Sequence, residues 1–454
     1  PAFEACVKEA DVEAIMGAYN RTNGEVCCAH SYLMDDVLRG QWDFQGHYVS
    51  DCGAIRDFHE SHKVTSRPEE SVTLALEKGC DMNCGCTYEK ILNAYEEGMI
   101  SKEVLRRSAI RVMTTRFLLG MFDETEYDKI PYEVVDCKEH RLLAEKAAAE
   151  SMVLLKNDGA LPFSHKKVAL YGAGASMTIK GGTGSGEVNS RYFVNVEQGL
   201  KDAGFTVTTG SWLDAYDRTY ESARKQFKQN IKVEAKAKKM NPMMYAMGKV
   251  MPEPEYQLPL DGEGDVAIYV LARISGEGND RDPVPGDIKL SATEKRDILA
   301  LNQKYSKFML VINAGGAVDL SEIDEVQNIL VLSQLGVETG AALADILLGK
   351  QNPSGKLATT WAAWEDYFPM EDFGDHNDTR YREGIYVGYR YFDSVGKKAL
   401  FPFGYGLSYT TFAYSNLRLS AETISDTDTL TATVTVKNTG SIDSVNVNFV
   451  EAYT

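Results

Sequence analysis

The chain has 454 residues, of which 44% are apolar and 25% are charged; at roughly 150 residues per domain this ordinary globular composition predicts about three domains and excludes disorder as the main state. Its 48 basic and 66 acidic side chains give a net charge of −18, which argues against nucleic acid or an anionic membrane as a partner, because both recruit basic patches. No apolar run is long enough to cross a bilayer, so we expect no transmembrane segment and no membrane partner.

The first 120 residues alternate short apolar runs with helical patterns, which is typical of a parallel sheet or barrel. We expect a buried strand over 14–20, a second over 47–51 and a weaker third over 79–83. Helices are expected between and after them, over 31–38, 69–77 and 104–119. In such folds the polar residues at the carboxyl ends of the strands form the site, and here they are Tyr19, Asn20, Asp51 and Asn83. Three such units are too few to close an eight-fold barrel.

A polar, irregular stretch with Pro131 then predicts a linker, after which a helix over 140–151 opens a second α/β region. Its expected strands lie at 168–171, 266–271, 308–313 and 329–332. Residues 212–251 form an insertion with a basic helical pattern. We interpret it mainly as a solvated helix face, with a binding surface as the alternative.

The pattern changes again after Phe412. Leu430–Lys437 alternates strictly between apolar and polar residues, and the turn residues of Asn438–Gly440 follow. This predicts a half-buried antiparallel strand and the start of a β-sandwich that stops at Thr454 before it is complete.

Three places in the sequence offer candidate chemistry. Asp51 at a strand end is placed to act as a nucleophile or base, although a helix cap is the commoner role for such a residue. Glu277 stands between two glycines in a loop after a buried strand, as a proton donor or an ordinary loop residue. The glycine-rich run Lys180–Gly186 has its lysine before the glycines, against the order of a phosphate-binding loop, so a loop lining a carbohydrate cleft fits better.

The compartment stays open. The chain begins at Pro1 and not at a methionine, so we expect it to be cut from something longer, and the lack of a signal peptide leaves both a cytoplasmic and a secreted location possible. Eight cysteines, seven of them before residue 87, are too few for a disulfide scaffold. Because the zinc spacing Cys-x2-Cys is absent, we expect one or two disulfides or buried thiols instead of a metal.

Taken together, five ordered motifs resemble glycoside hydrolase family 3. The motif over Gly17–Gly24 is similar to the family's Ser-Tyr-Asn-x-x-Asn-Gly strand end, and Leu38–Gly46 with Val49–Asp51 is similar to its nucleophile segment. The motif over Val153–Pro162 is similar to the opening of the family's second domain. Two further motifs, Asn352–Leu357 and Phe401–Phe412, are highly specific to the family.

The resemblance implies an α/β protein in three domains. Its parts would be the C-terminal part of a (β/α)8 barrel over 1–125, a linker over 126–139, an α/β sandwich domain over 140–400 and the start of a fibronectin-III-like β-sandwich over 401–454. The earlier barrel strands and the sugar-binding residues that they carry are missing from this sequence. A further chain or segment supplying those strands is therefore an expected partner, because the barrel strands would otherwise have open edges.

The family implies a retaining exo-acting β-glycosidase that acts on terminal β-linked sugars. By this resemblance Asp51 is the nucleophile, Glu277 is the acid/base and Tyr19 lies beside the nucleophile. Retention needs the two carboxyl groups about 5–5.5 Å apart, with a raised pKa for Glu277 and a low one for Asp51. Tyr19 is expected to supply a hydrogen bond to the carboxylate of Asp51. We expect the site to be a cleft between the domains, since the two acids lie in different domains.

The sugar is left open between glucose and xylose. Family β-glucosidases often have Trp after the nucleophile, whereas β-xylosidases often have Cys, as Cys52 is here; we place glucose first on the family's prevailing activity alone. The same pattern implies a Cys52–Cys84 disulfide in the pocket wall. No metal or organic cofactor is implied, because two carboxylates suffice for the chemistry. A non-catalytic sugar-binding remnant is the alternative from another class.

Overall fold

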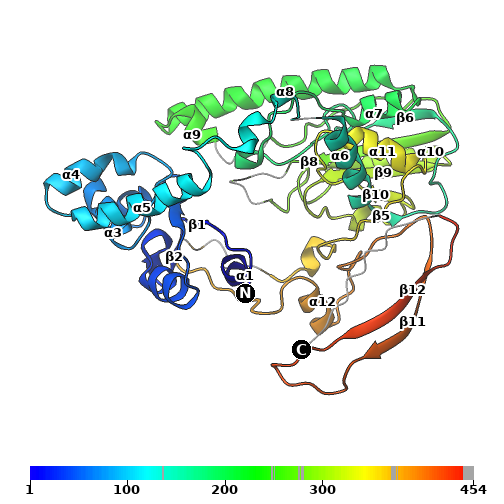
Figure 1. The fold of residues 1–454 in the computed structure, drawn as a ribbon. Coiled ribbons are helices and arrows are strands. Elements are labelled where there is room, and N and C mark those ends of the chain that lie inside the picture. Colours follow the sequence, from blue (N-terminus) through cyan, green and yellow to red (C-terminus); the bar gives the residue numbers. More distant parts are fainter. Residues whose placement is uncertain are drawn as a thin grey trace. The chain divides into compact units, whose positions relative to one another are not determined.

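The computed structural model describes residues 1–134, 137–246, 249, 251–274, 277, 281–369, 375 and 377–442. The chain divides into two compact units, unit 1 over Pro1–Val135 and unit 2 over Asp136–Thr454. Each unit is described by itself (Figure 1).

Unit 1 is built around a short parallel pair of strands. β1 (Ala14–Gly17) pairs with β4 (His47–Ser50), from Ala14 opposite His47 to Gly17 opposite Ser50. The third expected strand, over 79–83, is reduced to a single bridge between Val49 and Met82. A small antiparallel pair, β2 (Arg21–Thr22) with β3 (Glu25–Val26), follows β1.

The expectation that residues 14–20 form a buried strand is wrong in two respects. The strand ends at Gly17, and the Met16 side chain is 62% exposed. A run of apolar residues predicts a strand, but it does not show which side chains of the strand are buried. Burial depends on the elements that pack on each face of the strand, and the strand's own sequence does not specify them.

The three helices expected in unit 1 are confirmed with small shifts of their ends. They are the π-helix η2 (Tyr32–Gln41), α3 (Pro68–Glu77) and α5 (Lys102–Leu118). Local sequence explains two starts, because Pro68 occupies the first position of α3 and the Ser101 hydroxyl caps α5 by accepting from the Val104 amide at 3.3 Å. Shorter elements are α1 (Ala2–Lys8), η1 (Cys27–Ala29), α2 (Asp57–Glu60), η3 (Thr87–Lys90), α4 (Ile91–Glu96), η4 (Glu126–Lys129) and η5 (Tyr132–Val134).

Unit 2 contains a six-stranded sheet in the order β5-β10-β9-β8-β6-β7. All neighbouring strands are parallel except β5 and β10, which are antiparallel. The strands are β5 (Val153–Lys156), β6 (Lys167–Tyr171), β7 (Thr206–Val207), β8 (Val266–Arg273), β9 (Phe308–Ala314) and β10 (Ile329–Val331). Four of them are the four that the sequence predicts; β5 and β7 escaped the prediction.

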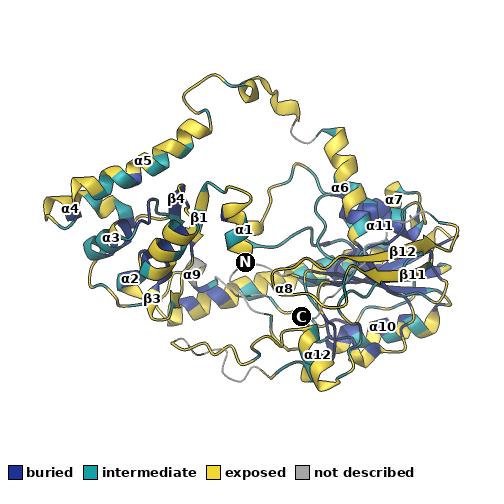
Figure 2. Ribbon diagram, turned by 60° about the horizontal axis from the view of Figure 1, so that its bottom comes forward, coloured by how far each residue is buried: buried dark blue, intermediate teal, exposed yellow. Residues whose placement is uncertain are grey.

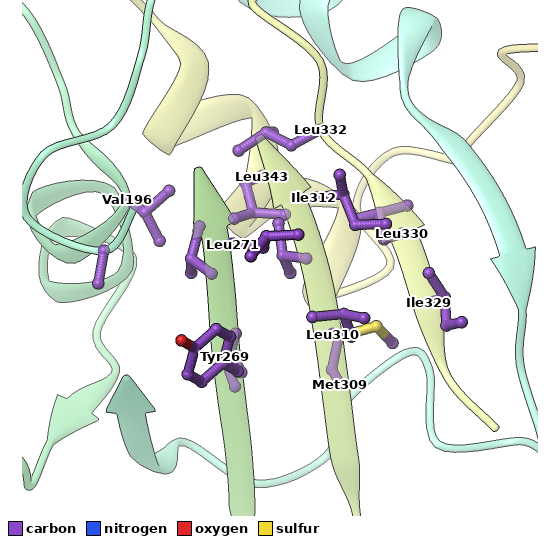
Figure 3. Packing of buried hydrophobic residues seen from close by; sticks show 14 of the residues in the cluster. Val196, Tyr269, Leu271, Met309, Leu310, Ile312, Ile329, Leu330, Leu332 and Leu343 are labelled. Carbon is purple, nitrogen blue, oxygen red and sulfur yellow. The ribbon is translucent and has the colours of Figure 1, made fainter. Parts of the chain in front are cut away.

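Helices cover both faces of this sheet, which is why β9 is buried along its whole length. Figure 2 shows the strands buried and the helices exposed on their outer sides. Figure 3 shows Leu271, Leu310 and Leu330 of three adjacent strands packed near Leu343 of α11. The helices and turns are α6 (Lys138–Ser151), η6 (Gly184–Gly186), α7 (Val196–Asp202), α8 (Gly210–Ala237), α9 (Pro242–Ala246), α10 (Ala292–Lys304), η7 (Ser321–Ile323), α11 (Thr339–Leu347), η8 (Trp364–Asp366) and α12 (Tyr389–Val395).

The basic insertion folds as helix α8, followed by the short α9. Trp212, Leu213 and Tyr216 of α8 are buried against the sheet domain, and Ile231 with Ala235 packs on Tyr245 of α9. Its basic side chains are exposed, as the interpretation as a solvated helix face requires. Among the described residues no helix combines the length and the apolar character needed to span a bilayer.

The strand expected near 430–437 is present as β12 (Ala432–Asn438), paired antiparallel with β11 (Phe412–Leu419). The expectation that it is half-buried is wrong, because every residue of β12 is exposed. Half-burial requires a second layer of sheet over one face, and the hairpin is a single layer. The part of the expected sandwich that falls on 443–454 lies outside the described residues.

Candidate active site

Asp51 follows directly after β4, at the carboxyl end of the parallel pair. Its amide donates to the Gly17 carbonyl at the end of β1, at 3.0 Å. Its Oδ1 accepts from the Cys52 amide at 2.6 Å. The alternative role as a helix cap has no support, because the next helix, α2, begins six residues later with Arg56 at its N-cap.

A disulfide joins the residue after Asp51 to a neighbouring strand end. Cys52 and Cys84 form the bridge that the family resemblance implies. Backbone and side-chain bonds reinforce it: the Gly53 amide donates to the Cys84 carbonyl at 2.8 Å, and the buried Ser50 hydroxyl accepts from the Asn83 side-chain amide at 3.0 Å. The disulfide and these hydrogen bonds therefore hold residues 50–53 against residues 83–84. Asp51 lies between Ser50 and Cys52, which both take part in these contacts.

Tyr19 lies beside this turn. Its hydroxyl donates to the Cys52 carbonyl at 2.9 Å, and its side chain is 45% exposed. His62 contacts the Tyr19 carbonyl through Nε2 at 2.8 Å, which fixes the backbone on the other side. The structure thus brings three of the predicted residues together: Tyr19, Asp51 and Cys52.

Two further groups beneath the turn were not predicted from the sequence. The Asp81 carboxylate is buried and accepts from Arg39 at 3.4 Å, from Arg111 at 3.3 Å and from the Tyr48 amide at 3.0 Å. It ties the segment after α3 to β4. The buried thiols of Cys28 and Cys80 form a hydrogen bond that lowers the pKa of Cys28 and, with burial, raises the pKa of Cys80. The cysteine positions were visible in the sequence, but their contact was not.

Glu277 belongs to unit 2 and follows the central strand β8. Its Oε2 accepts from the Ser185 amide at 2.7 Å, and a Cβ on Gly184 would lie 2.7 Å from the same oxygen. Gly184 has φ +72°, so the glycine-rich turn passes close to the carboxylate in a conformation that favours glycine. The glycine-rich run Lys180–Gly186 therefore contacts Glu277 through the Ser185 amide.

The raised pKa expected for Glu277 is not found. Hydrogen bonds from the Ser185 side chain and amide lower the pKa of Glu277 below its ordinary value. Two causes account for the direction: the side chain is exposed, so burial penalises the anion little, and both donors stabilise the ionised form. Ser185 is the contact that sequence reasoning missed, although it lies in a run that the sequence singled out.

The two carboxyl groups belong to different units, so the separation of about 5–5.5 Å and the cleft between the domains stay predictions. Within the described part of the chain no group of three or more His, Cys, Asp and Glu side chains is placed to hold a metal ion.

Unit 1 thus carries an acidic residue at the carboxyl end of a parallel strand, and unit 2 carries another in the connection after β8 of its helix-covered sheet, which is where α/β folds usually place functional residues. Residues 1–115 match the N-terminal domain and residues 152–409 the C-terminal domain of glycosyl hydrolase family 3. The chain belongs to this family.

Its relatives include both β-glucosidases and β-xylosidases. Thermostable beta-glucosidase B of Acetivibrio thermocellus is 32% identical over 96% of this chain and 53% of its own length. A probable exo-1,4-beta-xylosidase, xlnD, of Neosartorya fischeri is 32% identical over 91% of this chain and 50% of its own. The chain spans about half the length of these curated relatives.

A solved structure extends the likeness to the fold. Beta-glucosidase 3B from Thermotoga neapolitana in complex with glucose superposes with a TM-score of 0.76 and 33% identity, over 96% of this chain and 60% of that one. The chain therefore carries part of the family's N-terminal domain followed by its C-terminal α/β sandwich domain.

Proposed function

We propose that this chain serves a retaining, exo-acting β-glycosidase that hydrolyses terminal non-reducing β-D-glucosyl residues by double displacement. The observation that carries the proposal is the turn after β4, where Asp51, Tyr19 and the Cys52–Cys84 disulfide meet in a family 3 chain. A carboxylate fixed at a strand end by its backbone, next to a tyrosine, suits a nucleophile that must keep its orientation through two steps.

In the proposed reaction Asp51 attacks the anomeric carbon as the leaving oxygen departs, which forms a covalent glycosyl-enzyme. Glu277 first donates its proton to that oxygen and then accepts a proton from the incoming water. Because its contacts with Ser185 favour the anion, Glu277 needs less polar surroundings on its other side, which a bound sugar would supply by excluding water, before it can carry a proton at neutral pH.

A β-xylosidase is the second candidate, and a specific feature favours it. Cys52 follows the nucleophile and is bridged to Cys84, as the resemblance to xylosidases implies, and relatives at 32% identity carry that name. Glucose stays first because a similar solved structure is a glucose complex.

We further propose the domain limits 1–125, 126–139, 140–400 and 401–454, with the hairpin β11–β12 as the start of a fibronectin-III-like sandwich. A chain or segment that completes the barrel is the proposed partner of unit 1. Several large apolar side chains of unit 1 are exposed, which supports this proposal; they are Phe3, Leu92, Leu118, Leu119 and Met121.

The test compares p-nitrophenyl β-D-glucoside with the β-D-xyloside and follows Asp51→Asn. We expect the variant to lose at least about 1,000-fold in kcat, because no covalent intermediate forms without the nucleophile. Asp36→Asn, an exposed carboxylate of the same unit, is the matched control and should keep full activity. Wild-type turnover in Asp51→Asn would contradict the proposal, and binding of either sugar without any turnover would favour the remnant.

A further inference from the structure

Glu277 stands midway in a connection whose two ends are both held by one residue. Four residues before it, Arg273 ends the central strand β8, and four residues after it comes Arg281. Asp287 contacts both of these arginines. Asp287 therefore contacts one residue on each side of Glu277 along the chain.

The end at Arg273 is rigid. Its guanidinium is 4% exposed and pairs twice with the Glu294 carboxylate, at 2.7 Å in each contact. Glu294 in turn completes the capping box of α10 by accepting from the Ser291 amide at 2.8 Å. The remaining Nε of Arg273 donates to the Asp287 carbonyl at 2.7 Å. The end of β8 is thus fixed to the start of α10 and to Asp287 at once.

The other end is held by the side chain of Asp287. Its Oδ1 accepts from Arg281 Nε at 2.7 Å and its Oδ2 accepts from the Asp282 amide at 2.6 Å. Arg281 also donates through one terminal nitrogen to the Ala317 carbonyl at 2.7 Å. These side chains are mostly buried, with 18% of Arg281 and 30% of Asp287 exposed, so solvent screens the pair less than it would screen a surface ion pair.

We propose that Asp287 is a positioning residue for Glu277: its carbonyl and its carboxylate clasp the two ends of the connection and hold Glu277 against the turn at Ser185. This proposal rests on the proposed acid/base function of Glu277. Asp287 itself touches no reacting group in it, so its removal should act only through the placement of Glu277.

The chemistry of the clasp makes Asp287→Asn a sharp variant. An asparagine at 287 keeps one acceptor oxygen but turns an NH2 group toward one of two donors, the Arg281 Nε or the Asp282 amide. One of the two contacts is therefore lost while size and backbone stay the same. Asp282→Asn is the matched control, because it removes the same charge from an exposed side chain in the same segment.

The first experiment measures the pKa of Glu277 in the 454-residue chain by NMR of carboxyl-labelled glutamate, with Glu277→Gln to assign the signal. In the wild type we expect a value below the ordinary one. Asp287→Asn should raise the pKa of Glu277 measurably toward the ordinary value of a glutamate, because the Ser185 contact loosens, and Asp282→Asn should leave it unchanged. Arg281→Lys, which removes the Nε–H that donates to Asp287, serves as a second variant should Asp287→Asn fold poorly.

A pKa of Glu277 that stays at the wild-type value in both Asp287→Asn and Arg281→Lys overturns the proposal, even if the two variants melt at lower temperature. That result would leave Asp287 a purely structural role.

The second experiment compares the hydrolysis of phenyl and 2,4-dinitrophenyl β-glucosides. The dinitrophenolate leaves without a proton, so a misplaced acid slows the phenyl substrate selectively. Asp287→Asn should reduce phenyl glucoside hydrolysis at least about five-fold more than dinitrophenyl glucoside hydrolysis, in the same sense as Glu277→Gln but less strongly. If Glu277→Gln slows the phenyl glucoside more than the dinitrophenyl glucoside and Asp287→Asn does not, the positioning role of Asp287 is wrong. If Glu277→Gln slows both substrates equally, the proposed acid/base function of Glu277 is wrong instead, and the NMR experiment still tests whether Asp287 positions Glu277.

Discussion

Glu253, which has no part in the proposed reaction, shows how strongly its surroundings change the pKa of a carboxyl group. Burial raises the pKa of Glu253 from its ordinary value near 4.5 to about 7, although the Tyr216 hydroxyl donates to it and favours the anion. Among the charged groups around Glu253, Glu294 of α10 and Glu255 raise its pKa, and Arg273 of β8 lowers it. Folding therefore opposes its ionisation.

This shift predicts a pH-dependent stability. Glu253 is neutral in both states below about pH 4.5, but from there to about pH 7 only the unfolded chain releases the proton, so the folded state loses stability across that window. Glu253→Gln keeps the acceptor for Tyr216 and has no charge to lose. We expect the variant to unfold with a free energy up to about 3 kcal/mol higher than wild type at pH 8 and nearly equal at pH 4.

Urea unfolding of unit 2 at both pH values measures the effect, with exposed Glu325→Gln as the control that should match wild type throughout. A gain of equal size at pH 4 and pH 8 would show that ionisation of Glu253 is not its cause.

At the same scale, the sequence predicted the identity of neighbours better than their electrostatics. Tyr19, Asp51 and Cys52 meet because each ends or follows a strand, and strand ends are visible in the apolar pattern. The pKa of Glu277 was predicted in the wrong direction because it depends on Ser185, which is 92 residues away along the chain. Contacts of that kind come from tertiary packing, which no local pattern specifies.

Between elements, backbones approach one another closely where α7 meets α11. A Cβ on Gly340 would overlap the Asn195 carbonyl, and a Cβ on Gly199 would overlap the backbone of Gly340. The Gly340 amide donates to the Val194 carbonyl at 2.9 Å in this contact. The start of α11 is therefore joined by a backbone hydrogen bond to the residues just before α7, and neither helix can move aside without losing that bond.

We expect Gly340→Ala to lower the free energy of unfolding by about 1–3 kcal/mol, since the added methyl group meets backbone atoms and not a flexible side chain. Gly210→Ala, at the start of α8 with no atom near its Cβ position, should be neutral or slightly stabilising because alanine favours a helix more than glycine does. Thermal and urea unfolding of the two variants test this. Equal destabilisation by both would attribute the effect to the backbone freedom of glycine.

Elements were predictable where their pattern is self-contained. β8 and β9 are long apolar runs buried on both faces, and the sequence located both. β5 escaped because it is only four residues long and runs into the turn at Asn157–Gly159, and β7 has just two residues. The position of the hairpin strand β12 was predicted correctly, but its burial was predicted wrongly. An alternating pattern indicates which face of a strand is apolar, but it does not show whether another element covers that face.

On the scale of the whole molecule, the two units differ in how well each closes its own core. Unit 2 surrounds fully buried strands with helices, whereas unit 1 packs a smaller cluster around Leu38, Phe44 and Phe58 and exposes large apolar side chains. Burial of apolar area is the main source of folding free energy, so the units should differ in stability.

We therefore expect a fragment over 137–454 to unfold cooperatively in urea and a fragment over 1–134 to bind a hydrophobic dye and exchange its amide protons within minutes. The intact chain, with the same dye and the same exchange times, is the reference for both fragments. A cooperative transition of equal midpoint in the two fragments would contradict the difference.

The long helix α8 gives the molecule an uneven distribution of charge. Its 28 residues extend about 42 Å, and residues 224–239 carry seven basic side chains and one acidic one, a net +6 that leaves −24 on the remainder of the chain. The chain therefore combines a locally positive segment with a strongly negative remainder. In ion-exchange chromatography at neutral pH and low salt it should bind an anion exchanger through its acidic surfaces and still be retarded on a cation exchanger, where this helix faces the resin.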